Sequence, residues 1–255
     1  MQLNHKIFGQ GPPLIILHGL FGSLDNWQTL AKRWAEDFTV LLIDQRNHGR
    51  SPHTEAHTYP LMAQDLQAFM VDNGLPMAHI LGHSMGGKTA MQFALQHPDM
   101  VDKLVVVDIA PKTYPPGHTT IINALHALDL DQISNRSMAD EQLARSIAEP
   151  GVRQFLLKNL TRNPECGYRW KINLPTLTQY YPHILKNIEL DGVLEKPALF
   201  IRGDRSDYIK DEDLLTILEH FPQARLETVK SAGHWVHAEQ PDTLYHLVRD
   251  FLVAP

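Results

Sequence analysis

The sequence contains one cysteine, Cys166, so it holds no internal disulfide framework, as is typical of a reducing compartment. Basic residues are also scarce: 23 lysine and arginine residues against 29 acidic ones give a net charge of −6, which argues against a nucleic-acid partner. The longest apolar runs, such as KLVVVDIA, are far too short to span a bilayer, and MQLNHKIFGQG lacks the apolar stretch of a signal peptide. We therefore expect a cytoplasmic protein with no membrane partner.

Short apolar runs recur along the chain, with stretches of helical periodicity between them. The runs are continuous rather than alternating, as expected of strands buried on both faces of a parallel sheet. Apolar spacing of three and four residues after Pro241 predicts a final amphipathic helix. The pattern as a whole predicts an α/β fold with a mostly parallel central sheet and helices on both faces. The predicted strands are LIIL (14–17), VLLI (40–43), HILG (79–82), LVVV (104–107), ALFI (198–201) and ARLETV (224–229).

The interval between Ala110 and Leu190 breaks this rhythm, because it has no strand-like run and only helical segments separated by prolines and glycines. It is far longer than an ordinary connection in such a fold. We expect residues 111–190 to form an all-helical cap inserted after the strand at 104–107, the sixth strand in the numbering of the fold that this pattern resembles. Residues 1–110 and 191–255 are then expected to form the core domain.

GHSMG at 82–86 has the pattern G-x-S-x-G, with strand-like AHIL before it and helical GKTAMQFALQ after it. A serine between a strand and a helix is lifted clear of the sheet and can act as a nucleophile. The two glycines leave room for a turn in which Cβ atoms would clash. Ser84 is the predicted nucleophile, and a glycine-rich turn without chemistry is the alternative. The backbone amides of Met85 and of Leu20, in LHGLFGS, are predicted to form an oxyanion hole.

Fifteen histidines compete for the role of general base. In the chain order serine, acid, histidine, the base lies on the loop after the last strand, here SAGHW. His234 is therefore the predicted base, and His237 is the alternative, better placed to pack against or cap the final helix. We expect His18 to support its own turn, and Arg46 and His48 to brace loops. No paired cysteines or H-E-x-x-H pattern occurs in the sequence, so we predict neither a metal nor a cofactor.

The carboxylate that orients the histidine is harder to assign. It must accept a hydrogen bond from the second ring nitrogen and hold the tautomer. The loop after ALFI reads GDRSDY, and its third position after the glycine is Ser206 rather than an acid, with Asp204 and Asp207 on either side. Asp108 ends the strand LVVV and can reach the same crevice, because the carboxyl ends of parallel strands open to one side. Asp108 can equally cap its own loop, so the residues alone leave all three acids open.

Seven segments spread over nearly the whole chain together resemble the α/β-hydrolase esterases of the bacterial YbfF type. The resemblance implies a serine-dependent carboxylesterase that acts on acyl esters or acyl thioesters, acyl-CoA included, through an acyl-enzyme. It also implies that Asp108 is the acid and that Ser206 assists the histidine as a fourth member. The segments are HGLFGSLDNW, DQRNHGRSP, GHSMGGK, VVDIAP, QFLLKNL, YYPHI and AGHWVHAEQP.

We therefore expect a small-molecule acyl ester or thioester as substrate. Trp170, Tyr180 and Tyr181 are predicted to wall an acyl pocket, with core packing as the alternative for each. Two other functions remain open: a lyase that uses the serine and histidine for proton abstraction, and a receptor that keeps an inactive triad. Between 112 and 189 nine basic residues outnumber seven acidic ones, which is typical of a solvated helix face and weakly favours an anionic leaving group such as coenzyme A. Five of the nine carry most of this argument: Arg153, Lys158, Arg162, Arg169 and Lys171.

Overall fold

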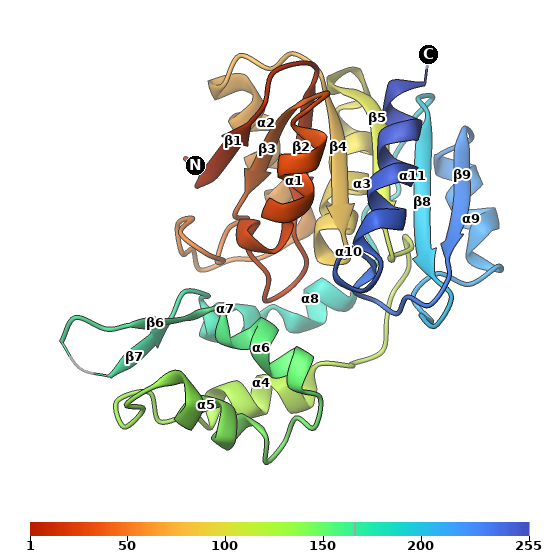
Figure 1. Cartoon of the computed structure of the whole chain (residues 1–255). Coiled ribbons are helices and arrows are strands. Elements are labelled where there is room, and N and C mark those ends of the chain that lie inside the picture. The colour runs from red at the N-terminus through yellow and green to blue at the C-terminus, as the bar shows by residue number, and fades with distance from the viewer. Residues whose placement is uncertain (166, 255) are drawn as a thin grey trace.

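A seven-stranded sheet in the order β1-β3-β2-β4-β5-β8-β9 forms the centre of the computed structural model, which describes residues 1–165 and 167–254 (Figure 1). Cys166 lies outside the described residues. β1 pairs antiparallel with β3, and the other neighbours in this sheet pair in parallel. The prediction of an α/β fold with a mostly parallel sheet is confirmed. The strands are β1 (His5–Phe8), β2 (Pro13–Leu17), β3 (Thr39–Ile43), β4 (Ala78–His83), β5 (Val101–Val107), β8 (Ala198–Gly203) and β9 (Ala224–Val229).

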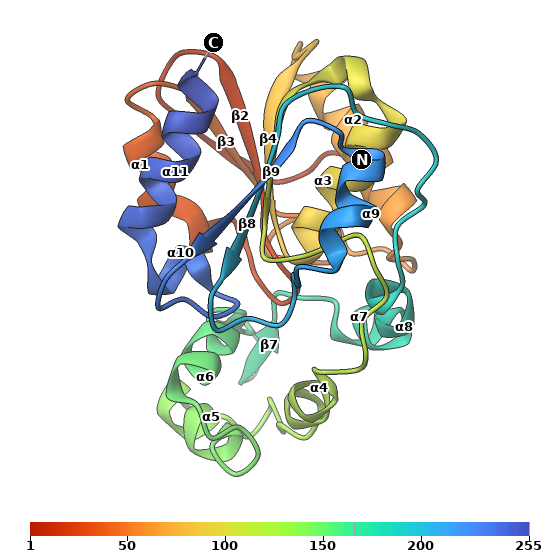
Figure 2. The same cartoon turned by 90° about the vertical axis from the view of Figure 1, so that its right-hand side faces the viewer.

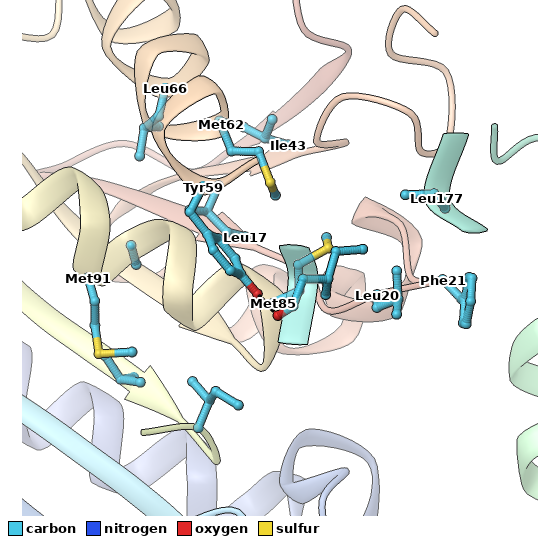
Figure 3. Close-up of a cluster of buried hydrophobic side chains, with 14 of the residues drawn as sticks. Leu17, Leu20, Phe21, Ile43, Tyr59, Met62, Leu66, Met85, Met91 and Leu177 are labelled. Carbon is cyan, nitrogen blue, oxygen red and sulfur yellow. Dashed lines mark hydrogen bonds between the residues drawn. The ribbon is translucent and has the colours of Figure 1, made fainter. Parts of the chain in front are cut away.

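The continuous apolar runs are explained by two hydrophobic clusters, one on each face of the sheet. In β2, Leu14 and Ile16 belong to one cluster, and Ile15 and Leu17 belong to the other. Successive side chains of a strand point to opposite faces, so a strand covered on both sides must be apolar at every position. Figure 3 shows part of the second cluster, where Leu17 lies among side chains from α2 and α3.

Helices cover both faces of the sheet. Figure 2 shows α1 and α11 on one face, and α2, α3 and α9 on the other. The last helix begins at Pro241, as the sequence predicted. The helices of this part are η1 (Leu24–Trp27), α1 (Gln28–Trp34), α2 (Tyr59–Asp72), α3 (Met85–Gln96), η2 (Pro98–Met100), α9 (Asp213–His220), α10 (Val236–Glu239) and α11 (Pro241–Val253).

The segment between β5 and β8, called the insertion from here on, lies across the carboxyl ends of the parallel strands (Figures 1 and 2). The prediction that it is all-helical is wrong, because β6 and β7 form an antiparallel hairpin within it. Each of these strands has three residues, too few for an alternating pattern to be recognised in the sequence. The elements of the insertion are α4 (Thr119–His126), α5 (Arg136–Leu143), α6 (Pro150–Leu157), β6 (Leu160–Arg162), β7 (Tyr168–Trp170), α7 (Leu174–Gln179) and α8 (Tyr181–Leu185).

The domain boundaries at residues 110 and 190 and the cytoplasmic location stay predictions. In the described part of the chain, no helix combines the length and the apolar character needed to cross a membrane.

Candidate active site

Ser84 stands between β4 and α3 in a strained turn. Its φ of 53° and ψ of −121° lie in a region that residues with a Cβ rarely adopt. The flanking glycines make this turn possible: a Cβ on Gly82 would lie 2.2 Å from the Gly86 carbonyl oxygen, and one on Gly86 would lie 2.3 Å from that of Leu17. The G-x-S-x-G pattern therefore forms the predicted strand–turn–helix.

Three side chains from three separate loops form one hydrogen-bonded chain. His234 Nε2 lies 3.0 Å from Ser84 Oγ, and His234 Nδ1 lies 2.8 Å from Asp108 Oδ2. Asp108 has no solvent-exposed surface, whereas Ser84 and His234 are half-buried. In this arrangement the imidazole can take the hydroxyl proton while the carboxylate holds its tautomer and orientation.

The geometry separates the three candidate acids. Asp108 Oδ1 accepts the Gly203 N–H at 3.1 Å, and its Oδ2 accepts the Ser206 hydroxyl as well as His234 Nδ1. Asp204 and Asp207 are both exposed to solvent. The structure thus brings Asp108 to the imidazole, and it brings Ser206 to Asp108 rather than directly to the ring.

Replacing Ser206 with alanine is expected to lower kcat for an ester about tenfold, the scale of one modest hydrogen bond. The loss is limited because Asp108 keeps the Gly203 N–H and the imidazole as donors. Ser206→Thr retains a hydroxyl and is the matched control, expected to stay close to wild type. An unchanged rate for Ser206→Ala would show that its hydroxyl plays no part in turnover.

Two backbone amides beside Ser84 are available to bind an oxyanion. Met85 is the first residue of α3, where N–H groups have no intrahelical acceptor. Within residues 1–165 and 167–254, the Leu20 N–H donates to no acceptor. Both residues line a cavity that also contains Ser84, and Figure 3 labels both in the same buried cluster. Their role as an oxyanion hole stays a prediction.

Comparison with known proteins places this geometry in a family. A family model described as the alpha/beta hydrolase fold matches residues 12–139. The chain belongs to the α/β-hydrolase family. It is 42% identical over 251 residues to "sn-1-specific diacylglycerol lipase ABHD11" of Mus musculus. The aligned region covers 94% of this chain and 81% of the lipase. It is 39% identical over 241 residues to "Esterase YbfF" of Escherichia coli, which covers 94% and 92%.

A solved structure is also close to this α/β-hydrolase. The "Marine microorganism esterase" is 44% identical, with a TM-score of 0.96 over 98% of this chain and 99% of that chain. The resemblance to the YbfF-type esterases is therefore confirmed.

Buried histidines support the turns of this hydrolase around Ser84. His18 Nε2 accepts the Gln45 N–H at 3.1 Å, so its Nδ1 carries the hydrogen and donates to the Gly19 carbonyl at 2.8 Å. Burial lowers the pKa of His18, which favours this neutral form. His83, next to Ser84, donates from Nε2 to the His234 carbonyl at 2.9 Å and so fixes the backbone of that residue. The structural role predicted for His18 is confirmed.

The other two loop-bracing predictions and the alternative base are also settled by contacts. Arg46 holds buried Asp65 with two hydrogen bonds of 2.6 and 2.9 Å, and His48 Nε2 accepts the Phe21 N–H at 3.2 Å. His237, in α10, stacks on Trp27 with ring centroids 4.6 Å apart, so its ring packs against η1, whereas the final helix was the expected partner.

Sequence reasoning missed two aromatic residues that surround the catalytic imidazole. Tyr208 stacks on His234 with ring centroids 3.8 Å apart and planes 18° from parallel. His118, just before α4, forms a hydrogen bond between its Nδ1 and the Tyr181 hydroxyl at 3.1 Å. Burial and the neighbouring His234 lower the pKa of His118 to about 4. Tyr208 stands two residues after Ser206 in GDRSDY, but no pattern in the sequence says that its ring turns toward the imidazole.

Two cavities open on Ser84. We name them the His234 cavity, of about 220 Å³, and the Met85 cavity, of about 550 Å³. Leu20, Ser84, Gly117, His118 and Tyr208 line both. The other walls of the His234 cavity include Phe21, Val152, Phe155, His234 and Trp235, and those of the Met85 cavity include Tyr59, Met85, Ile109, Tyr181 and Ile184.

Of the three aromatic residues predicted to wall an acyl pocket, the structure places one at a cavity beside Ser84. Tyr181 lines the Met85 cavity, but the described lining of both cavities excludes Trp170 and Tyr180. Trp170 ends β7, in the hairpin, and Tyr180 follows α7 with its ring 5.3 Å from that of His183. The sequence does not reveal which side of a short helix or hairpin faces the sheet, so it could not separate these two positions from Tyr181.

The five basic residues singled out in the sequence give no support for a coenzyme A site. Arg153 pairs with Asp140 at 2.9 Å, and the Arg162 guanidinium lies over the Tyr168 ring at 5.4 Å. Among described residues, the walls of the two cavities include none of the five basic residues singled out in the sequence. No group of three histidine, cysteine or acidic side chains in the described chain could hold a metal ion.

Lys88, one turn after the nucleophile elbow in α3, ties both ends of the insertion to this helix. Its Nζ donates to the carbonyls of Lys112 at 2.7 Å, Leu185 at 3.3 Å and Lys186 at 2.6 Å. Lys112 precedes α4, and the other two residues end α8 and follow it. The side chain is 1% exposed, so the three carbonyls replace the water that an ammonium group would otherwise bind.

The buried Lys88 is expected to make stability depend on pH. Burial and the neighbouring Lys112 lower the pKa of Lys88 to about 7, whereas in the unfolded chain it is about 10.4. Between these pH values the unfolded chain binds a proton that the folded chain has released, so stability rises with pH. From pH 7 to pH 9 the unfolding free energy of the wild type should rise by about 2 kcal/mol relative to Lys88→Met.

Urea unfolding of both proteins at several pH values measures this difference. Lys230→Met, which removes an exposed lysine, is the matched control and should follow the wild type. Parallel pH profiles for the wild type and Lys88→Met would contradict the prediction.

Proposed function

We propose that this α/β-hydrolase cleaves small to medium carboxylic esters through an acyl-enzyme on Ser84. The observation that carries the proposal is the unbroken hydrogen-bonded chain from Ser84 through His234 to buried Asp108. The printed names of relatives about 40% identical, an esterase and a lipase, support ester hydrolysis as the reaction class.

In the first half-reaction Ser84 Oγ attacks the substrate carbonyl while His234 Nε2 takes the hydroxyl proton. Negative charge develops on the carbonyl oxygen, where the Leu20 and Met85 amides stabilise it. The bond to the alcohol then breaks, the imidazolium gives its proton to the leaving oxygen, and an acyl-enzyme remains. Asp108 stabilises the imidazolium throughout.

In the second half-reaction water takes the place of the alcohol. His234 accepts a proton from the water, whose oxygen attacks the acyl-enzyme, and Ser84 leaves with that proton. The net reaction is ester plus water to acid plus alcohol, and it needs no cofactor. Acyl thioesters fit the same steps with a thiol as leaving group, so we include them in the proposal.

The purified protein, p-nitrophenyl butanoate and a fluorophosphonate probe test this function. We expect catalytic release of p-nitrophenol and covalent labelling of the peptide that contains Ser84, detected by mass spectrometry. A lyase would be labelled without turning over the ester, and a receptor with an inactive triad would show ligand-induced thermal stabilisation without turnover. Either result would overturn the proposal.

A further inference from the structure

The two cavities at Ser84 differ in the catalytic group that each contains. Among described residues, His234 and Trp235 line the His234 cavity alone, whereas Met85 and Ile109 line the Met85 cavity alone. Because Ser84 lines both, a carbonyl bound at its hydroxyl has a separate space for each half of an ester.

The position of the imidazole decides which half enters which space. When the tetrahedral intermediate collapses, the leaving oxygen must be within hydrogen-bond reach of the proton on His234 Nε2. That nitrogen lies 3.0 Å from Ser84 Oγ, on the side of the His234 cavity. The alcohol half therefore extends past the imidazole, and the acyl half extends the other way, past Met85.

We propose, on the basis of the esterase function above, that the Met85 cavity binds the acyl group and the His234 cavity binds the alcohol. The acyl cavity has about 550 Å³ and the alcohol cavity about 220 Å³. The preferred substrates are then esters whose acyl group is larger than their alcohol.

The walls of the Met85 cavity combine non-polar side chains with four charged ones, Lys88, Lys112, Asp207 and Lys210. Its non-polar surface comes from residues such as Ile109 and Ile184. Lys88 also lines it, but three backbone carbonyls already take its N–H groups, and Lys112 is paired with Asp213. These two lysines are committed to the protein, and Asp207 and Lys210, which carry opposite charges, are exposed to solvent. The non-polar residues are therefore the ones expected to contact the acyl chain.

The walls of the His234 cavity restrict the alcohol. The ring of Phe155, from α6, lies 5.6 Å from that of Trp235, which follows the catalytic histidine. Phe21 and Tyr208 add two more rings. Rings have few rotatable bonds, so this cavity admits a compact alcohol and excludes a branched or polycyclic one.

Two series of esters test the assignment by proton release at constant pH. Ethyl esters from acetate to octanoate vary the acyl group, and butanoate esters from ethyl to naphthylmethyl vary the alcohol. For the wild type, kcat/KM should rise at least tenfold along the first series and fall at least tenfold along the second.

Two variants narrow one cavity each. Ile184→Trp should lower the octanoate-to-acetate ratio of kcat/KM at least tenfold. It should change the naphthylmethyl-to-ethyl ratio of kcat/KM less than twofold. Val152→Trp should lower the naphthylmethyl-to-ethyl ratio of kcat/KM at least tenfold. It should change the octanoate-to-acetate ratio less than twofold. Leu215→Trp, on the exposed face of α9 and 80% exposed, is the control for adding a tryptophan.

The enlarging variants Ile184→Ala and Phe155→Ala provide the same crossed test if a tryptophan prevents folding, which a thermal unfolding curve would reveal. They should favour longer acyl groups and bulkier alcohols, respectively. If the Ile184 variants changed alcohol selectivity, or the Val152 and Phe155 variants changed acyl selectivity, the assignment of the cavities would be overturned. The proposed esterase function would still stand as long as activity depended on Ser84. Ester hydrolysis that survives Ser84→Ala would instead overturn the proposed function.

Discussion

Ser84→Ala is expected to lower kcat for a p-nitrophenyl ester about 10⁶-fold, the loss seen when the nucleophile of a serine–histidine–aspartate triad is removed. The reason is that alanine cannot form the acyl-enzyme, while His234 and Asp108 keep their mutual hydrogen bond. Steady-state rates measure the effect, and the fluorophosphonate probe should no longer label the protein.

The fold should survive this change, because alanine occupies less space than serine and the backbone strain at φ 53° is common to both. Ser137→Ala, on the exposed surface of α5, is the matched control and should keep wild-type kinetics. A Ser84→Ala variant that retained more than a hundredth of the activity would show that another group carries the chemistry.

Asp108→Asn is expected to lower kcat by a factor of about 10³–10⁴, because an amide no longer holds the imidazole in the productive tautomer or stabilises its positive charge. The shape of the buried site is preserved, since asparagine has the volume of aspartate and can still accept the Gly203 N–H. Rates on one ester over a range of substrate concentrations would separate this loss in kcat from a change in KM.

Asp204→Asn and Asp207→Asn, in the loop after β8 that faces Asp108, are the controls. Both residues are exposed, so both variants should remain near wild type. A collapse of activity in Asp207→Asn, with Asp108→Asn active, would reverse the assignment of the acid.

The nucleophile and the base could be found from the sequence because each depends on local chemistry. A tight turn between a strand and a helix needs glycine on both sides of Ser84, and all the residues that form this turn lie in one five-residue segment, GHSMG. His234 followed from its place after the last strand. The order of strands and helices likewise followed from runs of apolar residues.

The acid could not be found in the same way, because two loops offer carboxylates and only packing chooses between them. Asp108 and the GDRSDY loop follow β5 and β8, which are adjacent and parallel in the sheet. Asp108 and Gly203, which are 95 residues apart in sequence, are therefore joined by a hydrogen bond. The resemblance to known esterases favoured Asp108, but the residues alone did not.

By itself the sequence determined the α/β architecture, the strained turn at Ser84 and the chain order of the catalytic groups, because periodicity and turn chemistry act over a few residues. Tertiary structure alone decided which acid meets the imidazole, that Tyr208 stacks on it, and that two cavities of unequal size meet at Ser84. The physical reason is that these features arise where the loops after β5, β8 and β9 meet one another and the insertion. Contacts between segments distant in sequence produce no periodic pattern in the chain.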